Sequence, residues 1–261
     1  YLITEGNLTF NGNYHRSGHG VGERTACVDV TGNGTWKGTD TTCCHCWNYG
    51  YSGEKNLGGG AGFNISSQEG TGIFTNCTAY DCDGAGFYIA NGELNNCKAY
   101  DCSWGVWFSK IGTNVTIKNC DFNANRCDKS KNAGTDDFYG GCGIGSCWWT
   151  TANIIDCNIS GSNAAVWCGY GGIAKISGST LHNSDYGVVS DGEVTVSSST
   201  IRSNSQSGTL IKAGTATITN TEIYSNKYGI SNNGTVTMTS GDIHNNTDYG
   251  VVNSNTFTMN N

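Results

Sequence analysis

In the C-terminal third of the chain, short runs of alternating apolar and polar residues return at a fixed interval. Each run resembles a half-buried strand, and the four runs are AKIS (174–177), VTVS (194–197), ATIT (216–219) and VTMT (236–239). A second apolar position follows each run, and a glycine then recurs every 21 residues, at Gly187, Gly208, Gly229 and Gly250. Turn signals such as Asp191-Gly192 and Asn233-Gly234 separate the copies. The pattern predicts short strands joined by tight turns.

The same pattern extends into the cysteine-rich half of the chain. Segments 74–86, 94–105 and 154–160 align with the C-terminal copies, and 117–127 begins a copy that is interrupted at about 128–152. The motif GAGF occurs at 60–63 and again at 84–87. We therefore expect a regular region over 61–261, a loop insertion at about 128–152, and irregular cysteine-containing coils of the same solenoid over 1–60.

A period near 21 residues, built of β-prone runs and turn residues, predicts a β-solenoid. Helical repeats need long stretches of 3.6-residue periodicity, which the sequence lacks. The repeated lines resemble the right-handed parallel β-helix, or pectate-lyase-like, superfamily. This resemblance implies an all-β solenoid whose coils stack about 4.8 Å apart, so that equivalent residues form columns.

Specific columns follow from this register. Ala216, Ile218 and Ile223 are expected to face inward beside their counterparts Val236, Met238 and Ile243. An aligned turn position is expected to hold four asparagines whose amides can hydrogen-bond along the stack: Asn76, Asn96, Asn119 and Asn220.

Composition narrows the partners and the compartment. The net charge is −7 and basic residues do not cluster, which argues against nucleic acid as a partner. No apolar run approaches the ~20 residues of a membrane-spanning helix, and no cofactor is indicated. Fourteen cysteines point to an oxidising compartment, and the first residue, Tyr1, is expected to begin a mature secreted product or an excised segment. The predicted location is extracellular or at the cell surface, with glycosylation candidates at Asn7, Asn33, Asn64, Asn114, Asn158 and Asn233.

Cysteines within the repeat fall into two columns. Cys77, Cys97, Cys120 and Cys157 share one column, and Cys82 and Cys102 share another. A disulfide within one coil would span extended chain that is too long for the bond. Inter-coil disulfides and unpaired buried thiols remain the two alternatives. In or beside the insertion, Cys127, Cys142 and Cys147 are expected to staple the loop.

The densest cysteine cluster is TTCCHCW, with Cys43, Cys44, His45 and Cys46 in sequence. Zinc sites usually pair Cys-x₂₋₄-Cys with a second such pair, and this segment lacks that spacing. Because Cys27 is nearby, disulfide bonding is the favoured interpretation over a metal site or redox chemistry. No metal site is predicted.

Two patterns that suggest catalysis are incomplete. Gly18-His19-Gly20 and Asp136-Asp137 are similar to motifs of β-helical polygalacturonases, but their order along the chain is reversed. A lyase would need a basic residue beside calcium ligands; Asp81, Asp83 and Asp101 are candidates for calcium or are solvated turn residues. No catalytic residue is predicted, and a non-enzymatic role is favoured.

Aromatic residues suggest a binding surface. Trp104, Trp107, Trp148 and Trp149 lie near the insertion and either pack or offer a face to carbohydrate or a protein partner. Thr215, Thr217 and Thr219 are expected to stack outward on Thr235, Thr237 and Thr239, and these on Thr256 and Thr258, an arrangement found in ice-binding β-solenoids. The favoured hypothesis is a disulfide-stabilised structural or adhesive β-helix that associates end to end or with other surface proteins. The alternatives are a secreted polysaccharide-binding or polysaccharide-degrading protein and, less favoured, an ice-binding protein.

Overall fold

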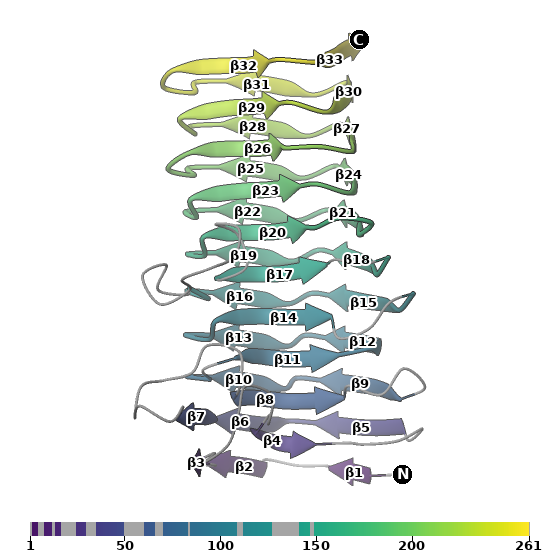
Figure 1. The fold of residues 1–261 in the computed structure, drawn as a ribbon, viewed down its shortest axis with the longest axis vertical. Coiled ribbons are helices and arrows are strands. Elements are labelled where there is room, and N and C mark those ends of the chain that lie inside the picture. Colours follow the sequence, from purple (N-terminus) through teal and green to yellow (C-terminus); the bar gives the residue numbers. More distant parts are fainter. Residues whose placement is uncertain are drawn as a thin grey trace.

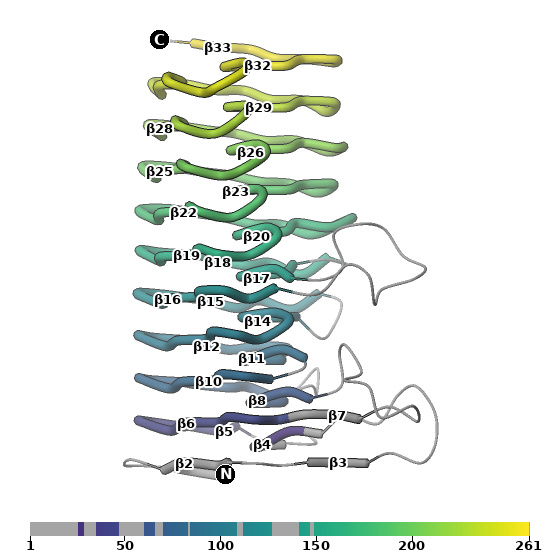
Figure 2. Tube along the Cα trace, turned by 90° about the vertical axis from the view of Figure 1, so that its left-hand side faces the viewer, coloured from purple at the N-terminus to yellow at the C-terminus, as the bar shows by residue number. Residues whose placement is uncertain are grey.

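The structure, a computed structural model, is a stack of β-coils along one long axis (Figures 1 and 2). It describes residues 2–4, 8–11, 14–16, 25–29, 35–49, 60–65, 70–82, 84–108, 112–126, 141–146 and 149–260. All strand pairs in these residues are parallel, and each coil contributes one strand to each of three long sheets. An all-β solenoid, as the sequence predicts, is confirmed.

The three sheets run the length of the stack. Five-residue strands dominate the first sheet, whose members are β1 (Leu2–Thr4), β5 (Thr35–Thr39), β9 (Thr71–Thr75), β12 (Asn91–Asn95), β15 (Asn114–Lys118), β18 (Thr151–Ile155), β21 (Ile173–Ser177), β24 (Glu193–Ser197), β27 (Thr215–Thr219), β30 (Thr235–Thr239) and β33 (Thr256–Asn260). Shorter strands form the second sheet, whose members are β2 (Leu8–Asn11), β6 (Thr41–Cys44), β10 (Thr78–Tyr80), β13 (Lys98–Tyr100), β16 (Asp121–Asn123), β19 (Asn158–Ser160), β22 (Thr180–His182), β25 (Thr200–Arg202), β28 (Glu222–Tyr224) and β31 (Asp242–His244). The third sheet consists of β4 (Thr25–Asp29), β8 (Gly60–Ile65), β11 (Ala85–Ile89), β14 (Trp104–Phe108), β17 (Cys142–Ser146), β20 (Ala164–Cys168), β23 (Tyr186–Ser190), β26 (Ser207–Ile211), β29 (Tyr228–Asn232) and β32 (Tyr249–Asn253). A further small pair is β3 (Tyr14–Arg16) with β7 (Trp47–Tyr49).

Alternation along each strand builds the interior. In β27 the second and fourth residues, Ala216 and Ile218, are buried and pair with Val236 and Met238 of the next coil. Ile223 likewise pairs with Ile243. These predicted columns are confirmed, and they form one continuous apolar core.

The recurring glycine of the repeat marks a close approach between coils. It is the second residue of most strands of the third sheet, where it faces the interior. A Cβ added to Gly208 would lie 2.8 Å from the carbonyl oxygen of Gly229 and 2.7 Å from Ile223 Cγ2. Contacts this short are not seen for real Cβ atoms, so the backbone requires glycine here.

One expected boundary changes. Strand β17 lies inside the range 128–152 that the sequence assigns to an insertion, so part of this range is a regular coil; residues 127–140 lie outside the described part of the chain. Toward the N-terminus, β1, β2 and β4 pair with strands of the regular sheets. Within the described residues, no helix is long and apolar enough to cross a membrane.

Candidate functional site

The turn between the first and second sheets begins with a residue in the left-handed conformation. Its members include Asn76 (φ 54°), Asn96 (φ 58°), Asn119 (φ 53°) and Asn220 (φ 48°), so the predicted asparagine alignment is confirmed. Asparagine and aspartate tolerate this conformation better than most residues. The backbone N–H of each of these four donates to a carbonyl of the next coil. The amide Nδ2 of Asn96 also donates to Asn76 Oδ1 at 2.8 Å.

The next residue in this turn points into the solenoid and forms what we call the first turn column. Its members carry a thiol or a hydroxyl: Thr41, Cys77, Cys97, Cys120, Cys157, Ser179, Ser199 and Thr221. Each side chain lies close to the carbonyl oxygen two residues before it, at 3.4 Å for the thiol of Cys97 and 2.7 Å for the hydroxyl of Ser199. Cysteine and serine therefore occupy one structural position.

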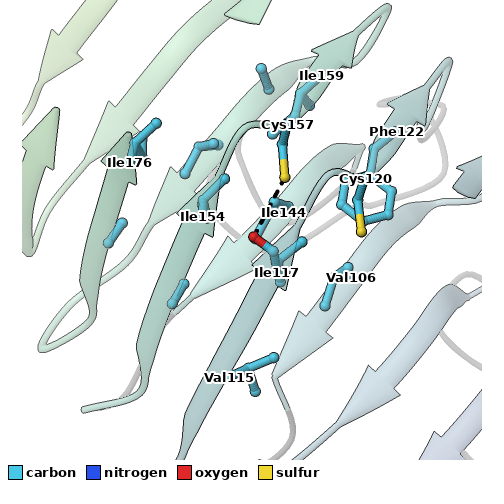
Figure 3. Packing of buried hydrophobic residues seen from close by; sticks show 14 of the residues in the cluster. Val106, Val115, Ile117, Cys120, Phe122, Ile144, Ile154, Cys157, Ile159 and Ile176 are labelled. Atoms are coloured by element: carbon cyan, nitrogen blue, oxygen red, sulfur yellow. Dashed lines mark hydrogen bonds between the residues drawn. The ribbon is translucent and has the colours of Figure 1, made fainter. Parts of the chain in front are cut away.

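Neighbouring coils are joined through this first turn column. The backbone N–H of Cys97 donates to Cys120 Sγ at 3.3 Å, and that of Cys157 donates to Ser179 Oγ at 3.1 Å. Cys157 Sγ in turn lies 3.5 Å from the carbonyl oxygen of Ile117 in the neighbouring coil (Figure 3). A sulfur in this column therefore serves as a hydrogen-bonding group, as the serine hydroxyl does.

A second turn column lies between the second and third sheets. Its members are small and polar or carry a thiol: Cys46, Cys82, Cys102, Asn125, Ser162, Ser184, Asn204, Asn226 and Asn246. The side chain of one coil accepts the backbone N–H of its neighbour, as in Cys102 N to Asn125 Oδ1 (3.2 Å) and Ser184 N to Asn204 Oδ1 (3.1 Å). The thiols of Cys82 and Cys102 in this column lie close to the carbonyl oxygen two residues before them, at 3.5 Å and 3.4 Å.

One disulfide forms at the N-terminal end of the described second turn column. Cys27 and Cys46 are joined across 19 residues of sequence, which confirms a disulfide at the TTCCHCW cluster. Cys43 is a buried thiol beside it. For the repeat cysteines, the structure has thiols at Cys77, Cys82, Cys97, Cys102, Cys120 and Cys157, the second of the two alternatives drawn from the sequence.

The remaining disulfide candidates stay predictions. Cys44 and Cys142 are buried. Cys127 and Cys147, expected to staple the insertion, lie outside the described residues.

Burial suppresses the chemistry of three of these thiols, whereas hydrogen bonds from neighbouring thiols lower the pKa of Cys77 and of Cys120. Burial raises the pKa of Cys43, of Cys97 and of Cys102, because a thiolate inside the solenoid would lose its hydration. The thiolate is the form that attacks disulfides and binds metals. Cys97 and Cys102 are therefore structural groups in the folded chain.

We expect the interior thiols to resist a thiol reagent such as DTNB until the chain unfolds. Labelling of Cys77, Cys97, Cys120 and Cys157, located by mass spectrometry, should be slower than in denatured protein by a factor on the order of 10³ or more, because it needs opening of the coils. Cys97→Ser is the matched control, since serine already occupies the column at Ser179; it should leave the melting temperature nearly unchanged. Fast labelling of these positions in the native protein would contradict the assignment.

One acidic residue near the disulfide, Asp81, is engaged in a local contact. Asp81 Oδ2 lies 2.6 Å from Nδ1 of His45, whose ring packs edge-on against Tyr80. Among the described residues, no group of three or more His, Cys, Asp or Glu side chains is placed to hold a metal ion. Asp83, the Gly18-His19-Gly20 motif and Asp136-Asp137 lie outside the described part of the chain.

The predicted tryptophans divide between packing and exposure. Trp107 stacks on Trp167 with ring centroids 5.7 Å apart, and Trp104 packs against Trp107 on the same side of the third sheet. Trp107 and Trp167 are buried, and Trp104 is half-buried. Trp107 and Trp167 therefore contribute packing surface. Trp148 lies outside the described residues.

Trp149 is different because it projects from the corner between the third and first sheets. Its side chain is 56% exposed and meets Tyr170, which is 71% exposed, edge to face at 5.8 Å. Trp149 also has φ of 60°, an uncommon backbone conformation for a bulky residue. A Cβ on the neighbouring Gly171 would lie 3.0 Å from the indole, so glycine makes room for the ring.

The glycosylation candidates differ in accessibility. Asn114, Asn158 and Asn233 are exposed, and Nδ2 of Asn158 donates to Asp121 Oδ1 at 3.1 Å. Asn64 is buried in β8 with 5% exposure, and its amide is not accessible in the folded chain. Asn7 and Asn33 lie outside the described residues.

The coil geometry and the interior columns define a parallel β-helix. Residues 142–261 match the family described as right handed beta helix region, which confirms the resemblance to the right-handed β-helix superfamily. Comparisons with curated proteins and with solved structures found no match.

Proposed function

We propose that this chain is a non-catalytic structural segment of an extracellular or cell-surface protein, working as a rigid rod. The observation that carries the proposal is the continuity of the columns. Backbone hydrogen bonds link every neighbouring pair of coils from β5 to β33, and the two turn columns add a side-chain bond between many of them. At about 4.8 Å per coil, the eleven strands of the first sheet extend over roughly 50 Å.

The stack also has a surface on which a further coil could be added. In the last coil, Ile243, Val251 and Phe257 are partly exposed although they continue columns that are buried elsewhere. Edge strands carry unpaired backbone groups that can pair with another chain. We infer that, where this edge of β31, β32 and β33 is free, it joins a second copy end to end, which would lengthen the rod.

Electron microscopy and analytical ultracentrifugation of the purified chain test this proposal. Straight rods longer than one chain are expected, with shortening to single chains in Phe257→Glu. Thr200→Lys, on the outer face of the second sheet, is the control that should leave the rods intact, because Lys98 lies in the same column. Single chains at all concentrations would overturn end-to-end association, and a flexible outline would overturn the rod.

A second candidate, carbohydrate binding, is favoured by the exposed pair Trp149 and Tyr170. Aromatic faces stack on sugar rings, and exposed aromatic pairs are uncommon on inert surfaces. Affinity electrophoresis against neutral and acidic polysaccharides should show retardation that Trp149→Ala removes. Tyr100→Ala, on the second sheet, is the control; equal retardation of all three proteins would reject the site.

A further inference from the structure

Nine threonines cover the outer face of the first sheet at its C-terminal end. They lie on β24, β27, β30 and β33, and we call them the threonine face: Thr195, Thr215, Thr217, Thr219, Thr235, Thr237, Thr239, Thr256 and Thr258. The strands pair in register without a bulge, so Thr195, Thr217, Thr237 and Thr258 form one straight column. The face extends one strand further than the sequence predicts, because Thr195 continues the column of Thr217.

The fold does not require threonine at these positions. Nearer the N-terminus the same outward columns hold Lys37, Ile73, Glu93 and Lys175, while the inward residues of those strands stay apolar. A strand of this sheet therefore tolerates charged and bulky residues on its outer face. Strand formation therefore does not explain why the outward positions of the last three strands, β27, β30 and β33, are almost all threonine.

The threonine face repeats in two directions. Neighbouring strands lie about 4.8 Å apart, and alternate residues along a strand lie roughly 6.7 Å apart. Threonine has a stiff χ1 because it is branched at Cβ, so equivalent side chains in the array are expected to share one rotamer. The face then presents parallel rows of methyl and hydroxyl groups with troughs between them.

This surface also lacks the features of a protein-binding site. Glu193 lies at its border, and the outward positions of β27, β30 and β33 carry only threonine and Asn260. Hot spots of protein interfaces are enriched in tryptophan, tyrosine and arginine, which are absent from these outward positions. A neutral surface that repeats in two directions fits a ligand that is itself a lattice of hydrogen-bonding groups.

We propose that the threonine face binds ice. Water molecules in the troughs would bond to the hydroxyls and be held at regular spacing by the methyl rows. Such an ordered layer can merge with the hydrogen-bonded lattice of a growing ice surface. This role is independent of rod formation, because it uses the side of the solenoid and not its end.

The test measures ice shaping and thermal hysteresis of the purified chain in a nanolitre osmometer. Wild-type protein should shape crystals and show hysteresis, and the double variant Thr217→Lys with Thr237→Lys should lose both. Lysine fits this column, as Lys175 shows, so the variant is expected to keep its melting temperature. Thr200→Lys, on the outer face of the second sheet, should retain full activity.

Three results would overturn the proposal. The first is that ice grows in a solution of the wild-type protein in the same way as in a solution of albumin at equal concentration. The second is unchanged activity in the folded double variant. The third is equal loss in Thr200→Lys, which would show a general effect of added charge and not a site on the first sheet.

Discussion

Replacing Asn226 by valine is expected to lower the free energy of unfolding by about 2–4 kcal/mol. Asn226 is 1% exposed, and its Oδ1 accepts the backbone N–H of Asn204 at 3.0 Å. Its Nδ2 donates to Asn246 Oδ1 at 3.1 Å and to the carbonyl oxygen of Ile201 at 3.3 Å. Valine is similar in size but can make none of these bonds. The buried N–H of Asn204 would lose its acceptor, which is the dominant cost.

Asn226→Ser is the matched control for this change. Ser162 and Ser184 hold equivalent positions in the second turn column, and Ser184 Oγ accepts the N–H of Ser162 at 3.2 Å. The serine variant should therefore lose less stability than the valine variant in urea unfolding followed by circular dichroism. If valine costs no more than about 0.5 kcal/mol, the level of a neutral surface change, the column is not a structural support.

The sequence predicted the solenoid because every coil repeats the same constraints. The inward pairs such as Ile218 with Met238, the left-handed turn at Asn96 and the glycine at Gly208 each follow from local spacing. A residue that recurs in register must recur for the same physical reason, since the coils above and below impose it. Positions that do not repeat, such as Trp149 and Tyr170, carry no such signal.

The role of the cysteines was harder to predict because residue type suggests redox chemistry before packing. Aligning Cys157 with Ser179 one coil later would have revealed the shared position, since both lie two residues after the end of a strand of the first sheet. A thiol and a hydroxyl can make the same short contact to the backbone there. Among the described cysteines of the two turn columns, several are therefore thiols that pack in the turn and do not form disulfides.

The insertion was overestimated for a related reason. Strand β17 contains two glycines, Gly143 and Gly145, and a pattern of apolar alternation cannot be recognised in it. Gly145 faces outward, where a Cβ would lie 2.7 Å from the ring of Trp107. Glycine at this position is therefore explained by a contact with a neighbouring coil. The sequence of the strand alone does not show that contact.

Replacing Phe87 by alanine should have an effect of similar or larger size, about 3–5 kcal/mol, because it opens a cavity in the aromatic core. Phe87 is fully buried, stacks on Phe63 with centroids 5.0 Å apart and meets Phe74 edge to face at 5.2 Å. The rings are held by coils on both sides, so the surroundings can collapse only in part. Val188→Ala, in the same column of the third sheet, is the control and should cost less, since it removes fewer buried atoms. The urea unfolding midpoints of the two variants test this prediction. Equal losses of stability in the two variants would mean that the aromatic cluster relaxes around the smaller side chain.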